Sequence, residues 1–249
     1  MPPSGGGGFS NRFERFTSFI PPALPVVHDC VPMETFWRDT AEFAPLLVKG
    51  AGVTVMITIA SLILSTFLGL FWALLRTSHI AVLSKISATF VNTIRGIPIL
   101  VQLFYIYFVL PDLGIQLSAF QAGAIGLGIA YSAYMSEVFR AGIEAIDVGQ
   151  VEAAQSIGMN RRLIMSRVVL PQAFRITLPP YGNNLIMLLK DSSQTSGITV
   201  AELSLQSKLI EASSFKNMTV FTLGAIGYLV MSLPLIFLVA RLEKRFKRT

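Results

Sequence analysis

Long uncharged runs of apolar residues recur along the chain and predict helices. Three runs of 20 to 23 residues carry no charge, at 53–75, 117–136 and 218–240. A helix needs roughly 20 apolar residues to cross the hydrocarbon of a membrane, whereas barrel strands would alternate over about ten residues. The sequence therefore predicts an all-α membrane protein.

Two weaker runs each contain one arginine and at least one proline. They cover 86–110, with Arg95 and Pro98, and 168–189, with Arg175 and three prolines. Proline breaks inside a membrane are tolerated where protein or a water-filled cavity surrounds them. We therefore expect five transmembrane helices in total, with the two broken ones lining any pathway.

The distribution of basic residues predicts the orientation of these five spans. One side of the membrane receives 7 Lys and Arg in 86 residues, and the other receives 12 in 58. Because the more basic side is cytoplasmic, the N-terminus is expected outside and the C-terminus in the cytoplasm. The net charge of +6 then reflects topology and contact with anionic lipid, and a nucleic-acid patch is the weaker interpretation.

Composition excludes other classes. Only 14% of the residues are charged, against about 25% in a soluble domain. Cys30 is the single cysteine, and the two histidines lie far apart in the sequence, so neither a disulfide nor a zinc cluster is expected. No G-x-x-x-x-G-K-[ST] phosphate loop is present.

The chain divides into three predicted segments. Residues 1–45 are expected to form a flexible or interfacial tail, Gly-rich at its start and without the features of a signal peptide. The mixed apolar and charged stretch 36–49, before the first span, is expected along the membrane interface. A transmembrane domain follows over 46–240, and 241–249 form a basic cytoplasmic tail. Gly123, Gly126, Gly224 and Gly227 are expected to permit close helix packing.

The longest loop on the basic side predicts a helix–turn–helix, which we call the loop hairpin (residues 144–168). Asp147 followed by Gln150 has the spacing of an N-terminal capping box. Gly158 is placed to end that helix, and Asn160 to cap the next. Glu152 with a small face of Ala153 and Ala154 suits docking to a cytoplasmic protein, although an ordinary solvated hairpin explains the residues equally well.

Several stretches of this chain resemble one transporter family. Glu152-Ala-Ala-Gln-Ser-Ile-Gly158, followed by Leu170-Pro171, resembles the EAA motif of permease subunits of ATP-binding-cassette (ABC) importers. Arg95-Gly-Ile-Pro-Ile-Leu-Val-Gln102 is similar to the corresponding stretch of the polar amino-acid uptake branch, with Ile97 where threonine is usual. After Lys190-Asp191 the family pattern is replaced by the polar run 192–196. The resemblance covers roughly residues 46 to 240.

The resemblance implies a type I ABC-importer-like permease fold and a transport subunit that is not itself an enzyme. Its partners would be two cytoplasmic ATPase subunits, a second permease chain (identical or a paralogue) and an extracytoplasmic solute-binding protein. ATP and Mg would bind the ATPase, so no cofactor is expected on this chain. The location implied is the bacterial plasma (inner) membrane. The resemblance assigns ATPase coupling to Glu152, Ala153, Ala154 and Gly158, with Arg161 and Arg162 flanking them.

Polar residues within the membrane are the candidates for the pathway, because they are costly there without a function. An amino acid carries a carboxylate and an ammonium group, so Arg95 or Lys190 could meet the first and Glu137 or Asp191 the second. The full candidate set comprises Arg95, Gln102, Gln121, Glu137, Asn183, Asn184, Lys190 and Asp191.

Two other classes of membrane protein compete with an ATP-driven importer. A secondary transporter or channel acting without an ATPase has no need for the Glu-Ala-Ala…Gly loop. A membrane enzyme would need a cluster of acid–base or metal-binding residues in the spans, and the sequence shows none. The importer permease is therefore the favoured interpretation, with the transported amino acid left open.

Overall fold

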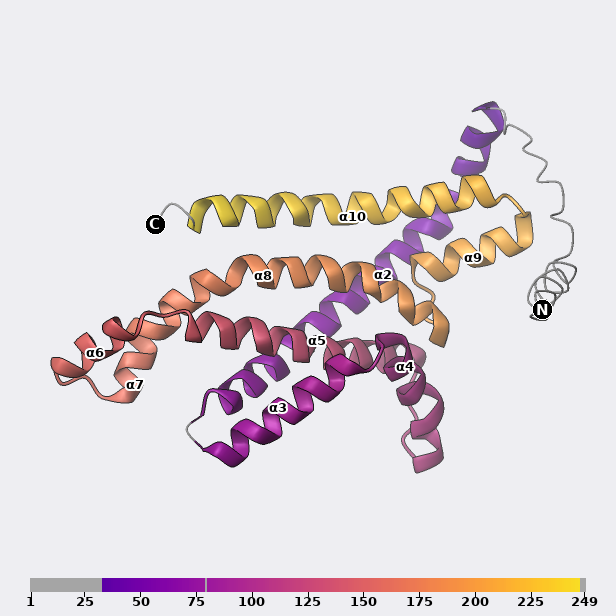
Figure 1. Ribbon diagram of the computed structural model, residues 1–249. Helices are drawn as coiled ribbons and strands as arrows, with labels where there is room; N and C mark the ends of the chain where they lie inside the picture. The colour runs from indigo at the N-terminus through magenta and orange to yellow at the C-terminus, as the bar shows by residue number, and fades with distance from the viewer. Residues whose placement is uncertain (1–32, 79, 247–249) are drawn as a thin grey trace, which may run out of the picture. The chain divides into compact units, whose positions relative to one another are not determined.

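The computed structural model describes residues 33–78 and 80–246, and every regular element within them is helical (Figure 1). The all-α prediction is thereby confirmed for these residues. Most of the predicted tail, including Cys30, lies outside them. The chain divides at Arg38 into two units, and the packing described below is that of the second, Asp39–Thr249.

Helix α2 (Met33–Arg76) contains the first apolar run and extends far beyond it. Residues 36–49 form the beginning of this helix, and their predicted position along the membrane interface stays a prediction. They have a buried face of their own, since Asp39, Phe43 and Leu47 recur at helical spacing and are buried. The Lys216 ammonium lies 2.6 Å from the Asp39 carboxylate, which compensates the buried charge.

The second predicted span is not one helix. Helix α3 (Ala81–Gly96) ends before Pro98, and α4 (Ile99–Phe104) leaves at a bend of 99°. Ile97 is extended, with φ −104° and ψ 130°, in keeping with the preference of a residue that precedes proline for extended backbone. A π-turn (η1, Tyr105–Val109) and a short 3₁₀ segment (η2, Leu110–Leu113) complete this arm.

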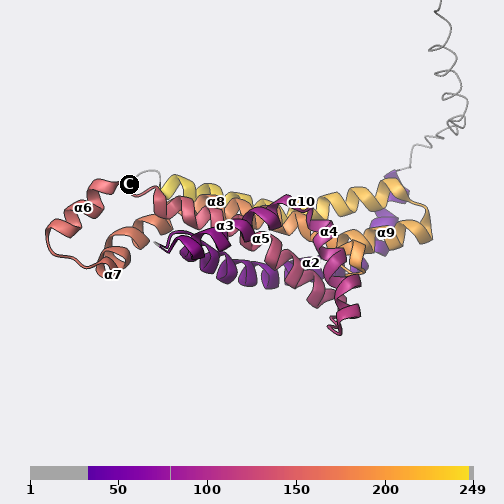
Figure 2. The same ribbon diagram turned by 60° about the horizontal axis from the view of Figure 1, so that its bottom comes forward.

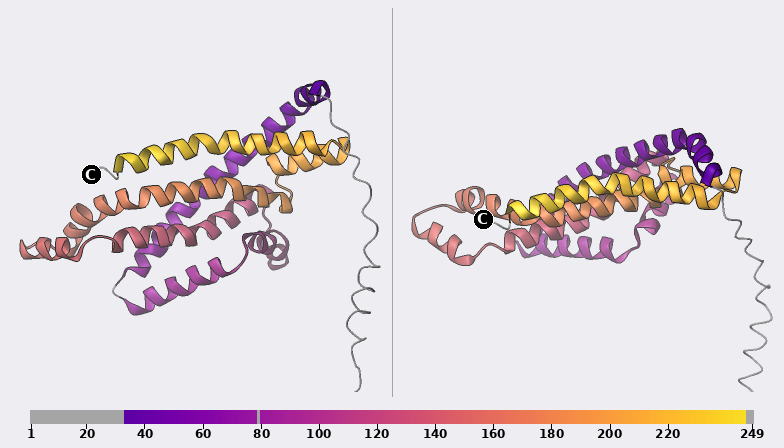
Figure 3. Two further views of the ribbon diagram at one scale, coloured as in Figure 1. Left: turned by 45° about the horizontal axis from the view of Figure 1, so that its top comes forward. Right: turned by 90° about the horizontal axis from the view of Figure 1, so that it is seen from above.

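Three long helices form the centre of the second unit: α5 (Ala119–Glu144), α8 (Leu170–Asp191) and α10 (Asn217–Phe246). Helix α8 packs against both α5 and α10 (Figure 3), and α3 packs against α5. Glycines permit close packing where α5 meets α4 and where α10 meets α9, as predicted. A Cβ on Gly126 would lie 2.7 Å from Leu103 Cδ2, and one on Gly227 would lie 2.8 Å from Leu203 Cδ2.

The polar run 192–196 begins a 3₁₀ segment (η4, Ser192–Ile198) that leads to α9 (Leu203–Ser214). Ser192 and Thr195 are buried, and their hydroxyls donate to the carbonyls of Leu189 and Ser192. These local hydrogen bonds explain how a polar replacement is accommodated inside the protein.

Two described helices, Thr35–Arg76 and Asn217–Arg245, are long and apolar enough to cross a membrane, and the bent α3–α4 arm makes a third if it counts as one span. The further spans predicted within α5 and α8 stay predictions. The loop hairpin connects α5 to α8 through α6 (Val148–Ser156), α7 (Arg161–Ile164) and the π-turn η3 (Met165–Val169). Figure 2 shows it beyond the end of the long helices, away from α9.

Candidate functional site

A chain of contacts, the polar track (Arg95, Tyr134, Tyr131 and Asp191), joins α3, α5 and α8. The Arg95 guanidinium lies over the Tyr134 ring, 5.5 Å from its centroid. The rings of Tyr134 and Tyr131 are 5.7 Å apart, and the Tyr131 hydroxyl donates to Asp191 Oδ2 at 2.7 Å. The track therefore carries an exposed cation at one end and a half-buried carboxylate at the other.

The structure brings together two of the predicted pathway residues, Arg95 and Asp191, through tyrosines that the sequence reasoning did not select. Tyr131 and Tyr134 are three residues apart, so they share a face of α5. Aromatic residues at helical spacing are common in any core, which is why this signal alone could not identify them. Only the packing of α3 and α8 against α5 brings the two tyrosines between Arg95 and Asp191.

The Gln102 side chain forms hydrogen bonds with the backbone at the bend between α3 and α4, a structural role that the sequence did not predict. Its amide nitrogen donates to the carbonyls of Ile94 and Ile97, both at 2.8 Å, and the side chain is buried. Carbonyls at the end of a helix lack intrahelical partners. The Ile94 carbonyl also accepts from the Ile97 amide at 3.4 Å. Gln102, from α4, adds a donor to each of the two carbonyls across the bend and thereby braces the turn of α3 that carries Arg95.

Glu137 is engaged by basic residues away from the polar track. Its carboxylate pairs with Arg76 of α2 at 2.9 Å and with Arg140 at 2.7 Å, and Arg140 also pairs with Glu144. These ion pairs connect the last turn of α2 to the end of α5 that leads into the loop hairpin. The structure thus places Glu137 in a network of its own and separates it from Asp191.

The remaining pathway candidates lie around α8 and α5. Asn184 is half-buried and its amide lies 3.8 Å from the Met135 sulfur, while Asn183 and Lys190 are exposed. Gln121 completes the capping box of α5 with Ser118. In the described parts of the chain, no group of His, Cys, Asp and Glu has an arrangement that could hold a metal ion.

The predicted caps of the loop hairpin are present. Asp147 accepts from the Gly149 amide and Asn160 from the Leu163 amide. Gly158 has φ +80°, and the amides of Gly158 and Met159 donate to the carbonyls of Gln155 and Ala154. This pair of bonds is a Schellman ending. The second bond of the predicted capping box, from the Asp147 amide to the Gln150 side chain, is not formed. The Gln150 side-chain oxygen instead accepts from the Gln172 amide.

The hairpin has a small apolar core and an exposed outer surface. Ala154 is buried with Ile146, Ile164 and Val169. The prediction that Ala153 and Ala154 form one small-residue face is therefore wrong. Adjacent residues on a helix lie about 100° apart, and only Ala153 is exposed. The exposed members of the predicted coupling set are Glu152, Ala153, Gly158, Arg161 and Arg162.

Comparison with known proteins identifies the family. Residues 65–248 match the family described as binding-protein-dependent transport system inner membrane component. The chain belongs to this family. The resemblance found in the sequence is thereby confirmed.

Relatives of this family member cover most of its length. The probable amino-acid ABC transporter permease protein YckA of Bacillus subtilis is 40% identical over 75% of this chain and 83% of its own. The L-cystine transport system permease protein TcyB of Bacillus subtilis is 37% identical, over 83% and 89%. The glutamine transport system permease protein GlnP of Escherichia coli K12 is 34% identical, over 86% and 99%. These relatives are transport permeases, so this chain is a transport subunit and not an enzyme.

Solved structures share the permease fold. One chain of the crystal structure of an amino acid ABC transporter with histidines is 36% identical and superposes with a TM-score of 0.79, over 83% of this chain and 97% of that one. A chain of the inward-facing MetNI methionine ABC transporter, at 22% identity, reaches 0.70 over 81% and 96%. The likeness to MetNI shows the fold alone.

Proposed function

We propose that this permease is the membrane-spanning subunit of an ATP-driven importer that moves a polar amino acid, or an amino-acid-like compound, across the bacterial plasma membrane. It would cross the membrane five times, with the N-terminus outside and the C-terminus in the cytoplasm. Two ATPase subunits, with their ATP and Mg, would dock below. A second permease chain and an extracytoplasmic solute-binding protein complete the assembly, and this chain itself holds no cofactor.

The observation that carries this proposal is the loop hairpin. Glu152, Ala153 and Gly158 are exposed on a short element whose two helices are capped and share a core. Because its helices are capped and packed, the hairpin would move as a rigid body when the ATPase subunits move, whereas a flexible loop would deform instead. Closure of the ATPase pair would thus move α5 and α8 together, which supports alternating access by domain rocking.

The polar track supports an amino acid as the solute. The exposed Arg95 guanidinium can meet a carboxylate, and the Asp191 carboxylate with the neighbouring phenol ring can meet an ammonium group. The named relatives that transport glutamine or L-cystine favour the same chemical class. Glu137 is a weaker partner for the ammonium group, because Arg76 and Arg140 already neutralise it.

Co-purification tests the ATPase coupling. Wild type, Glu152→Lys, Gly158→Val and the charge-matched control Glu211→Lys would each be purified through a tag on this chain. We expect wild type and the control to retain an ATPase subunit. Glu152→Lys should lose it by charge reversal at the contact, and Gly158→Val should lose it because valine is strained at positive φ. A wild-type chain that purifies alone and moves solute without ATP would instead establish a secondary transporter or channel.

Uptake kinetics test the polar track. In vesicles that contain the whole complex, Arg95→Met and Asp191→Asn should each raise the KM for the amino acid about tenfold or more, the equivalent of one charge-assisted hydrogen bond. Arg175→Met removes an exposed cation from α8, the helix that carries Asp191, as a control. An unchanged KM in both track variants would exclude the track as the amino-acid contact.

A further inference from the structure

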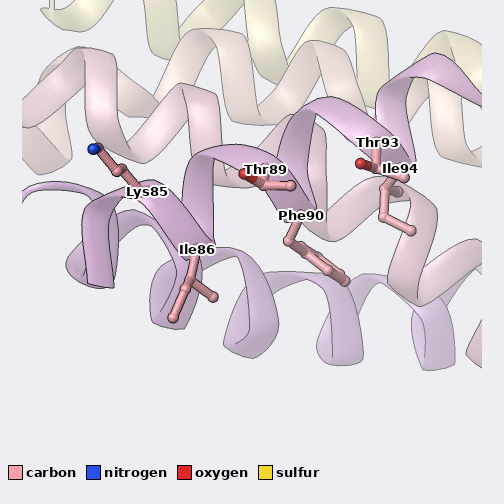
Figure 4. A pocket seen from close by; sticks show the side chains of 6 residues that line it. All are labelled: Lys85, Ile86, Thr89, Phe90, Thr93 and Ile94. Carbon is pink, nitrogen blue, oxygen red and sulfur yellow. The ribbon is translucent and has the colours of Figure 1, made fainter. Parts of the chain in front are cut away.

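Helix α3 turns a polar side away from the rest of its own chain. Five exposed residues on successive turns of the helix form this surface, the α3 stripe: Lys85, Thr89, Asn92, Thr93 and Gly96. Figure 4 shows Lys85, Thr89 and Thr93 projecting on one side of the helix and Ile86 and Phe90 on the other. A shallow groove of about 510 Å³ runs along α3 and is lined by Lys85, Thr89 and Thr93 of the stripe together with the neighbouring Ile86, Phe90 and Ile94.

The opposite side of α3 is the one that packs. Ser87 and Val91 are fully buried. The Phe90 ring stacks on Trp72 with centroids 4.0 Å apart, and the Ser87 hydroxyl donates to the Trp72 carbonyl at 2.7 Å. The helix is therefore fixed in its rotation about its axis, and the outward direction of the stripe follows from contacts within the chain.

A helix that faces lipid shows the reverse pattern. The exposed residues of α10 include Leu229, Val230 and Phe237, which hydrocarbon accepts without loss. Hydroxyl, amide and ammonium groups in the same position would lose their hydrogen bonds with water. The α3 stripe thus requires an aqueous or polar neighbour.

The stripe is continuous with the polar track. At its beginning, the Ser84 hydroxyl donates to the carbonyl of Arg76 at the end of α2. At its end, Gly96 adjoins Arg95 and the bend. From Lys85 to Gly96 the helix rises about 16 Å at 1.5 Å per residue. A polar surface therefore runs from the end of α2 as far as the residues proposed to meet the amino acid.

We propose that the α3 stripe lines the cytoplasmic half of a water-filled passage, through which a polar solute leaves the polar track. Its position on the cytoplasmic side rests on the proposed function, whereas its contact with water rests on the burial pattern of α3. Ser87, Phe90 and Val91 are committed to contacts within the chain, whereas the stripe has no such contacts in the described part of the chain and is available to the solute. Thr89 and Thr93 would replace part of its hydration as it passes.

Cysteine accessibility tests this proposal in the whole complex. Cys30, the single native cysteine, would be replaced by serine, and one cysteine introduced as Thr89→Cys, Thr93→Cys or, as the lipid-facing control, Val230→Cys. A charged, membrane-impermeant thiol reagent would be applied to inside-out vesicles. We expect the two α3 cysteines to react about tenfold faster than the control or more, because the reactive thiolate needs water. Equal labelling after denaturation would show that all three thiols are intact.

Each other outcome contradicts part of the proposal. Labelling of both α3 cysteines no faster than that of Val230→Cys would show a dry surface and overturn it. A disulfide between two copies at position 89, with no labelling, would show that a second permease chain covers the stripe. Labelling only from the outer face would overturn the cytoplasmic placement. Because the readout needs no transport, it can succeed even if the ATPase fails to co-purify, so the two proposals fail separately.

Discussion

Replacing Glu202 with leucine is expected to destabilise the protein by about 3 kcal/mol. The change removes the cap of a helix and leaves the buried Tyr228 hydroxyl without its hydrogen-bond acceptor. Glu202 is fully buried and caps α9. Its carboxylate accepts from the amides of Ser204 and Leu205, both at 2.8 Å, and from the Tyr228 hydroxyl of α10 at 2.6 Å. Leucine fills much of the space but accepts none of these bonds.

The environment of Glu202 shows why it is sensitive. Burial raises the pKa of its carboxyl above the ordinary value, and the hydrogen bonds from Tyr228, Ser204 and Leu205 act in the opposite direction. Beside it, the Leu203 amide donates to the Thr54 hydroxyl of α2 at 3.1 Å. The carboxylate therefore joins α9 to α10, and the adjacent Leu203 amide joins α9 to α2, so α9 loses one of its two anchors when the carboxylate is removed.

Thermal unfolding of the purified protein would measure the effect. Glu202→Leu should lower the midpoint clearly, and Glu202→Gln should lower it less, because the amide oxygen still accepts. Glu211→Leu makes the same replacement at a partly exposed position of α9 and should change little. A midpoint for Glu202→Leu equal to that of Glu211→Leu would show that the buried bonds do not contribute to stability.

The second large effect is expected at Gly142, where α5 crosses α8. A Cβ added there would lie 2.2 Å from Thr177 Cγ2 and 3.2 Å from the Ala173 carbonyl. Such a contact forces the two helices apart, so Gly142→Ala should destabilise the chain by about 2 kcal/mol. The crossing lies close to the loop hairpin, which begins where α5 ends. A displaced crossing should therefore also reduce ATPase co-purification.

A compensating change makes this prediction specific. Thr177→Ser removes the Cγ2 atom that the new methyl group meets and keeps the hydroxyl that donates to Phe174. The double variant Gly142→Ala with Thr177→Ser should recover much of the lost unfolding midpoint. Gly52→Ala is the control, since nothing lies within 4 Å of its added Cβ. Failure of the serine to restore any stability would indicate that the Ala173 carbonyl, and not Thr177, sets the helix separation.

Structural features that are set by residues close together in the sequence could be predicted from the sequence alone. The caps at Asp147 and Asn160 and the turn at Gly158 need only residues within one helical turn. The helical class follows in the same way, because a long uncharged run has few other stable forms in a membrane. The family resemblance likewise rests on short contiguous motifs, and it identified the transport subunit.

Contacts between distant segments decided the roles of individual polar residues. Gln102 braces the bend between α3 and α4, whose angle cannot be read from the local sequence. Glu137 pairs with Arg76 only because α2 ends beside α5. Tyr131 joins the polar track for the same reason, through Asp191, sixty residues away. A polar side chain in an apolar run must find some partner. The run itself predicts that need, but only the packing of the helices selects the partner.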